Sequence, residues 1–235
     1  MHVDAGRQRP LEYKMHALQN DRAAAMILTS RLRLRPHQVA DFARYLPLWQ
    51  QSETPSPGPA MSLSAEEAWA RLLRFVGHWS HFGYGLFIVE DLASGELVGE
   101  VGCAHYHRGV DERFETFPEA AWRVLASRRQ QGIASEAMLA ALAWFDHNVR
   151  PECTVCMVHA SNGPSLKVAA RLGYLEFARA NYKGQLVVLL QRHGGSAPGD
   201  EQPAADSGRA EASVFTSSNP VAEFGQDDRM TGWTD

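Results

Sequence analysis

The sequence predicts a mixed α/β fold in which one central sheet carries helices on both faces. Segments with strand or helix periodicity follow one another in the order strand, two helices, three strands, helix, strand, helix and two strands. Apolar residues make up 45% and charged residues 21% of the 235 residues, as in an ordinary globular core. This alternation and this composition are typical of a sheet whose two apolar faces are both covered.

The two ends of the chain differ in composition from its middle. Residues 1–25 are polar and lack the apolar core of a signal peptide, so we expect a loose N-terminal extension, or sequence upstream of a working protein that begins at Met26. Residues 193–235 are rich in Gly, Ser, Pro, Ala and acidic side chains, which predicts a disordered acidic tail. The predicted domain therefore covers residues 26–192.

The domain is predicted to begin with a strand and a helix. Residues 30–37 alternate polar and apolar side chains, which places Leu32 and Leu34 on one face of a strand. Residues 38–50 have helical periodicity, and we expect this helix to end at Pro47 because a proline removes a main-chain donor.

A loop and a second helix follow. Residues 54–62 contain three prolines and read as a loop. Ser64 and Glu67 have the spacing of a capping box, which predicts the start of a helix. Its apolar face is formed by Ala68, Leu72, Phe75 and Val76.

Three strands come next. Residues 84–91 and 96–106 are strand-like and are joined by a turn at residues 93–95. A polar loop leads to a third strand at residues 119–126.

The last part of the domain contains two helices and three strands. Residues 132–149 form the strongest helical pattern of the chain, and residues 153–160 form a strand. A shorter helix at residues 162–173 precedes a hairpin at residues 175–191, which turns at Lys183 and Gly184.

Charge and hydropathy narrow the choice of partners. The formal net charge is −4, so we expect no general attraction to nucleic acid. No apolar run reaches the roughly 18 residues that a membrane span needs. We therefore expect a cytoplasmic protein that is a monomer or a homodimer and binds neither nucleic acid nor membranes.

The cysteines and two of the histidines are candidate metal ligands by residue type. Cys153 and Cys156 form a C-x-x-C pair, but the sequence offers no second pair, and positions three apart on a strand point to opposite faces. These two residues and Cys103 are predicted to be small apolar residues that stay reduced. His105 and His107 have no carboxylate partner at matching spacing, so a structural or substrate-lining role is favoured and no metal is expected.

The segment "RRQQGIASEAM", residues 128–138, has the features of an anion site. It follows a strand and opens a helix, whose first turn has unpaired N–H groups and a partial positive charge. Gly132 allows close approach to the backbone, and Arg128 and Arg129 add positive charge. The loop lacks the glycines of a dinucleotide fingerprint and the lysine of a P-loop. It predicts a pyrophosphate cradle, with a plain helix N-terminus as the alternative.

Two motifs resemble the GNAT acetyltransferase superfamily. Residues 129–134 match R/Q-x-x-G-x-G/A, which resembles its coenzyme A pyrophosphate loop. Downstream, the N-x-x-S/A…G-F/Y segment of the family is matched at the right spacing by Asn162, Ser165, Gly173 and Tyr174. Within the superfamily, the chain resembles the branch of ribosomal-protein N-terminal acetyltransferases over residues 26–192.

This resemblance implies a fold and a mode of cofactor binding. The sheet would be mostly antiparallel, with about seven strands, and would splay between the fourth (residues 119–126) and the fifth (residues 153–160). The pantetheine arm would lie in that gap and pair with the backbone of Val124, Leu125 and Ala126. The other residues implied to bind acetyl-CoA are Arg129, Gln130, Gln131, Gly132, Ile133, Ala134, Ser135, Asn162 and Ser165. Asn162 is equally suited to be a helix N-cap, with Ser165 just inside the helix.

The resemblance also implies an activity. The chain would be an acetyl-CoA-dependent N-acetyltransferase that transfers an acetyl group directly, in a ternary complex, to a primary amine of a protein N-terminus or a small molecule. The alternative is a catalytically inactive CoA-binding regulatory module. Acidic side chains in the loop of residues 105–119 favour a cationic acceptor, although solvated loop charge explains them equally well.

Glu119 is implied to be the general base, with an ordinary exposed glutamate at the start of a strand as the alternative. Glu100 and Glu115 are weaker candidates. Many family members have a tyrosine seven residues after the motif asparagine as general acid, but this chain has Ala169 there. Ser165 or water is therefore the candidate that protonates the leaving thiolate.

Overall fold

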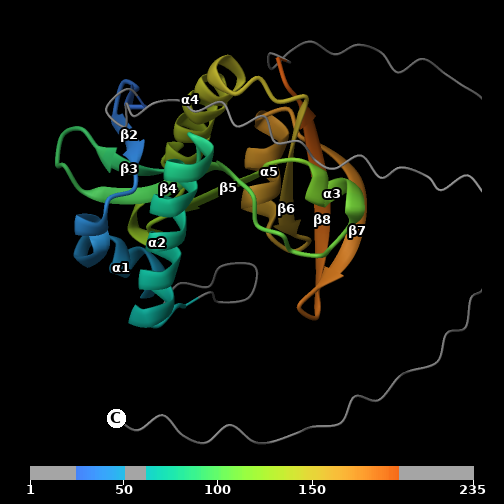
Figure 1. Cartoon of the computed structure of the whole chain (residues 1–235), viewed down its shortest axis with the longest axis horizontal. Coiled ribbons are helices and arrows are strands. Elements are labelled where there is room, and N and C mark those ends of the chain that lie inside the picture. Colours follow the sequence, from blue (N-terminus) through green and yellow to red (C-terminus); the bar gives the residue numbers. More distant parts are fainter. Residues whose placement is uncertain (1–24, 51–61, 196–235) are drawn as a thin grey trace, which may run out of the picture. The chain divides into compact units, whose positions relative to one another are not determined.

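A computed structural model describes residues 25–50 and 62–195 (Figure 1). The predicted N-terminal extension up to residue 24, the acidic tail from residue 196 and most of the proline-rich loop lie outside these residues. In the described part of the chain, no helix is long and apolar enough to cross a membrane.

The core of the fold is an eight-stranded sheet with the strand order β1-β2-β3-β4-β5-β6-β8-β7. Every neighbouring pair is antiparallel except β5 and β6, which are parallel. The strands are β1 (Ile27–Leu28), β2 (Leu32–Pro36), β3 (Leu86–Asp91), β4 (Leu97–Ala104), β5 (Glu119–Val124), β6 (Cys153–His159), β7 (Leu175–Tyr182) and β8 (Gln185–His193). The seven predicted strands are confirmed, and β1 is an additional one that is too short to show an alternating pattern.

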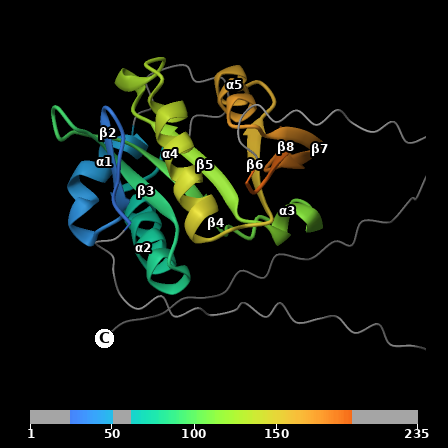
Figure 2. The same ribbon diagram turned by 90° about the horizontal axis from the view of Figure 1, so that it is seen from above.

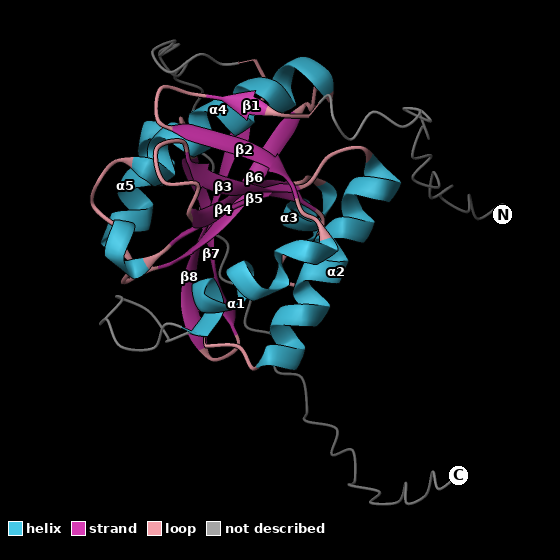
Figure 3. Cartoon of the chain, turned by 90° about the vertical axis from the view of Figure 1, so that its left-hand side faces the viewer, coloured by secondary structure: helices cyan, strands magenta, loops and turns pink. Residues whose placement is uncertain are grey.

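Helices cover both faces of the sheet, as predicted (Figure 3). On one face, α1 and α2 pack through a core cluster centred on Tyr45, Leu72 and Ile88. On the other face, α4 and α5 pack through the largest cluster, which includes Met138 and Leu172. The helices are α1 (Phe42–Gln50), α2 (Ala65–Phe82), α3 (Glu112–Thr116), α4 (Ile133–Asn148) and α5 (Gly163–Arg171).

Helix α2 starts where its capping box predicts. The Ser64 hydroxyl accepts the N–H of Glu67 at 3.2 Å, and the Glu67 carboxylate accepts the N–H of Ser64 at 2.8 Å. The helix ends at Gly83, which adopts a left-handed conformation with φ of 72°.

Two helical predictions were wrong. Helix α1 continues through Pro47 to Gln50, because a proline removes only one main-chain hydrogen bond while Leu48 and Trp49 are buried against α2 and the sheet. The polar loop before β5 contains the short helix α3, which is capped by the Asp111 carboxylate and holds Phe114 in the core.

Strands β5 and β6 meet at one end and then separate (Figure 2). Their only registered pair in the described residues is Glu119 with Val155, and the N–H of Val155 donates to the carbonyl of Pro118 at 3.0 Å. Farther along, the N–H of Leu125 donates to Val98 in β4 at 2.9 Å. The peptide groups of successive residues in a strand point to opposite sides. Since Leu125 faces β4, the N–H and carbonyl of Val124 face the gap toward β6. The predicted splay between the fourth and fifth strands is confirmed.

Candidate active site

The first turn of α4, at the open end of the gap, has main-chain N–H groups that are not used within the helix. The first helical hydrogen bond joins the N–H of Glu136 to the carbonyl of Gly132, so the N–H groups of Ile133, Ala134 and Ser135 have no acceptor within the helix. Gly132 has φ of 78°, which a residue with a Cβ rarely adopts. A Cβ there would meet nothing closer than Arg31 Nη2 at 3.7 Å, so the conformation rather than crowding requires glycine. We call residues 129–135 the Gly132 loop.

The charge around this loop differs in part from the prediction. Arg128 forms an ion pair with Glu96 at 2.6 Å, and Arg129 Nε lies 3.5 Å from the carbonyl of Val124. Sequence reasoning missed Arg31, whose Nη2 donates to the carbonyl of Gln131 at 3.2 Å. Arg31 reaches the loop from 100 residues away in the chain, and no local pattern signals that contact.

Asn162 and Ser165 lie at the other side of the gap. Parallel strands end at the same edge, so α5, which follows β6, begins beside the loop that follows β5. Asn162 is the N-cap of α5, because its Oδ1 accepts the N–H of Ser165 at 3.1 Å. Ser165 is half-buried in the first turn of the helix, whereas Ala169 is fully buried in the core.

Glu119 lies at the closed end of the gap, at the first residue of β5. It is only 5% exposed, so the prediction of an ordinary exposed glutamate is excluded. Its carboxylate is paired with Arg108, from Nε to Oε2 at 2.5 Å and from Nη2 to Oε1 at 2.7 Å. Burial raises the pKa of Glu119 more than Arg108 lowers it.

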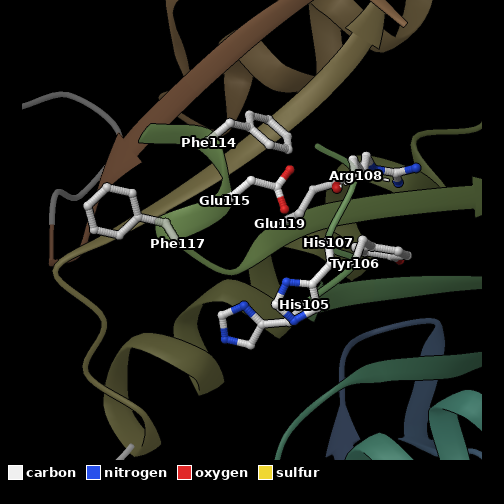
Figure 4. A pocket seen from close by; sticks show the side chains of 8 residues that line it. All are labelled: His105, Tyr106, His107, Arg108, Phe114, Glu115, Phe117 and Glu119. Atoms are coloured by element: carbon white, nitrogen blue, oxygen red, sulfur yellow. Dashed lines mark hydrogen bonds and ion pairs between the residues drawn. The ribbon is translucent and has the colours of Figure 1, made fainter. Parts of the chain in front are cut away.

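A pocket opens beside Glu119 (Figure 4). His105 and His107 line it with their rings stacked 6.2 Å apart. Burial lowers the pKa of His105, which favours the neutral form of this imidazole. The remaining lining residues are Tyr106, Arg108, Phe114, Glu115, Phe117 and Glu119.

The two weaker acidic candidates have other partners. Glu115 lines the pocket, and its Oε1 accepts the N–H of Gly109 at 2.9 Å, which fixes the loop before α3. Glu100 lies outside the pocket lining and is held by a buried network of Arg71, Tyr45 and His37.

The three cysteines lie in strands β4 and β6. All three cysteines are free and buried. Among the described residues, no group of three or more His, Cys, Asp or Glu side chains is arranged to hold a metal ion.

Comparison with known proteins identifies the family. Residues 31–175 match the sequence model of a family described as "Acetyltransferase (GNAT) domain". The chain belongs to the GNAT acetyltransferases. A protein from Bordetella pertussis, described as a GNAT-family acetyltransferase, is 33% identical over 71% of this chain and 98% of its own, with a TM-score of 0.66.

More distant solved structures share the fold of this GNAT acetyltransferase. A ribosomal-protein-S5-alanine acetyltransferase from Vibrio fischeri is 17% identical over 76% of this chain and 99% of its own, with a TM-score of 0.59. A ribosomal L7/L12 α-N-protein acetyltransferase in complex with coenzyme A is 15% identical over 72% of this chain and 97% of its own, with a TM-score of 0.58. The family match and the Bordetella pertussis relative show that the chain is an N-acetyltransferase of a family that uses acetyl-CoA.

Proposed function

We propose that this enzyme transfers the acetyl group of acetyl-CoA directly to a primary amine of a protein N-terminus or a small molecule, in a complex that holds both substrates. The observation that carries the proposal is the course of β5. The strand begins at Glu119 in the pocket, runs along the gap and leads into the Gly132 loop. A proton acceptor and an anion cradle thus lie at the two ends of one strand.

The open end of the gap suits the pyrophosphate and pantetheine of acetyl-CoA. The Gly132 loop offers main-chain N–H groups at a helix N-terminus. The gap-facing N–H of Val124 suits a carbonyl of pantetheine, whereas the Val124 carbonyl lies 3.5 Å from Arg129 Nε. The N–H and carbonyl of Leu125 are paired with Val98 and Arg128. Opposite them, Asn162 and Ser165 border the bound arm.

Glu119 removes the proton that keeps the acceptor nitrogen unreactive. The proton passes from the ammonium group to the carboxylate, directly or through water, and the neutral nitrogen attacks the thioester carbonyl. A main-chain N–H of β5 stabilises the oxyanion. The C–N bond forms and the C–S bond breaks. The second proton of the attacking nitrogen passes through Ser165 or water to the leaving thiolate, so that both end neutral.

The strength required of this base depends on the acceptor. At pH 7 an α-amine with a pKa near 7.8 costs about 1 kcal/mol to deprotonate, whereas a lysine-like amine costs about 4–5 kcal/mol. The raised pKa of Glu119 makes it a stronger base than an exposed glutamate.

Thiol release by the full chain tests the proposal. With acetyl-CoA and a panel of N-terminal peptides and small amines, we expect thiol release that requires an acceptor and equals the amount of acetylated product. Peptides with blocked N-termini are the control. Release of one equivalent of thiol without an amine would contradict direct transfer, and binding of acetyl-CoA without acetylation of any acceptor would indicate the inactive CoA-binding module.

A further inference from the structure

The pocket beside Glu119 already contains a cation, which belongs to the protein itself. The guanidinium of Arg108 makes two hydrogen bonds to the Glu119 carboxylate, at 2.5 and 2.7 Å (Figure 4). It lies over the ring of Tyr106 at 4.4 Å, and its Nη1 is 3.4 Å from the hydroxyl of Tyr182. A carboxylate and an aromatic face are the two features by which proteins bind cationic ligands.

Arg108 in this position opposes proton transfer to Glu119. An arginine keeps its proton in proteins, so a protonated Glu119 beside Arg108 would leave a buried positive charge without a partner. Removal of Arg108 alone would leave the buried carboxylate without a partner instead. If an ammonium group replaces the guanidinium, the charge pair is kept, and the following proton transfer leaves two neutral groups.

We propose that the Arg108 guanidinium occupies the position beside Glu119 where the acceptor's ammonium group binds. When the acceptor binds, the Arg108 side chain moves away from Glu119. This inference rests on the proposed role of the pocket as the acceptor site. Arg108 is then a specificity-determining residue, because only an amine that is cationic in solution can replace it at Glu119. The enzyme should therefore accept protonated alkyl amines and reject arylamines, which are neutral.

The surroundings of Arg108 allow its side chain to turn outward. The side chain is 22% exposed and lies between β4 and α3, next to His107 and Gly109, which both have positive φ angles. The hydrogen bond from Gly109 to Glu115 fixes the backbone at this point. The side chain can thus leave Glu119 without unfolding of the segment.

A cation probe tests the site without acetyl-CoA or an acceptor. In the full-length Arg108→Ala variant, methylguanidinium should fill the vacated position and raise Tm by about 3 °C at ten times its Kd. The matched control is Arg113→Ala, which removes a guanidinium that lies over Phe177 and contacts Gln191. Adding Glu119→Gln to Arg108→Ala should abolish the shift. Equal shifts in Arg108→Ala and Arg113→Ala would overturn the proposal.

Steady-state kinetics distinguish an Arg108 side chain that the acceptor displaces from one that stays paired with Glu119 during the reaction. With an amine from the acceptor panel, Arg108→Ala should lower KM for the amine about tenfold, and methylguanidinium should inhibit this variant competitively. If methylguanidinium restores activity that the variant has lost, Arg108 stays in place during the reaction, and the proposal is overturned. If methylguanidinium has no effect on the variant, Arg108 acts elsewhere, and the proposal is also overturned. Arg108→Gln keeps a donor for Glu119 and carries the same prediction if the alanine variant does not fold.

The two proposals fail in different ways. If no amine is acetylated, the proposed function fails, while the shift in Tm still decides whether Glu119 and its aromatic neighbours form a cation site. If amines are acetylated but methylguanidinium binds equally to both alanine variants, only the role of Arg108 fails.

Discussion

Replacement of Glu119 by glutamine should lower kcat by about 10²–10⁴-fold, the range that a positioned general base contributes. The amide can still accept a hydrogen bond from Arg108, so the pocket keeps its shape while the proton acceptor is lost. Steady-state kinetics with saturating acetyl-CoA measure the effect. Glu112→Gln, on the exposed side of α3, is the control and should retain full activity.

The pH profile gives a second test of Glu119. Burial raises the pKa of this carboxyl above its ordinary value, and the base must be ionised to act. kcat/KM of the unmodified enzyme should therefore fall as the pH drops through that raised pKa, and Glu119→Gln should lack this fall. A glutamine variant with activity within threefold of the unmodified enzyme would place the base elsewhere.

Replacement of Glu100 by alanine should destabilise the protein by about 3–5 kcal/mol, the usual effect of breaking a buried ion pair. Glu100 is 1% exposed and accepts hydrogen bonds from Tyr45 at 2.7 Å and from Arg71 Nε at 3.1 Å. Its loss would leave the Arg71 guanidinium in the interior without its carboxylate. Urea unfolding measures the change in free energy.

Glu96→Ala is the matched control for Glu100. The Glu96 and Arg128 side chains are 43% and 29% exposed, so solvent screens this pair and Glu96→Ala should destabilise the protein far less than Glu100→Ala. Equal effects of the two substitutions would contradict the buried network.

The Glu100 network also predicts how stability depends on pH. Burial opposes ionisation of Glu100, but Arg71 and His37 outweigh it and lower its pKa to about 2. Because this folded value lies below the unfolded value of about 4.3, the stabilisation is present above pH 4.3 and is lost as the pH falls toward 2.

Local sequence signals predicted most of the fold. The capping box of Ser64 and Glu67, the turn at Lys183 and Gly184 and the alternation of residues 30–37 each depend on neighbours in the chain. Helix α1 continued past Pro47 because tertiary burial outweighed a local preference. Helix α3 was missed because a helix of one turn has no periodicity to detect.

Residues of the candidate site could be predicted from the sequence only where they belong to a motif within one short segment. The Gly132 loop and Asn162 with Ser165 lie in short segments with recognisable spacing. The pairing of Glu119 with Arg108 and the approach of Arg31 to the loop depend on how the chain folds back on itself. Such contacts leave no pattern in the sequence, so the cation in the pocket could be found only in the structure.

Titration of acetyl-CoA into the Gly132→Val variant tests whether the Gly132 loop holds the cofactor. A β-branched side chain disfavours φ of 78° and adds bulk where the anion would approach, so we expect acetyl-CoA to bind at least about tenfold more weakly. Gly184→Val places the same side chain at φ of 75° in the β7–β8 hairpin and should leave the affinity unchanged. Unchanged affinity in Gly132→Val would contradict the assignment of the loop.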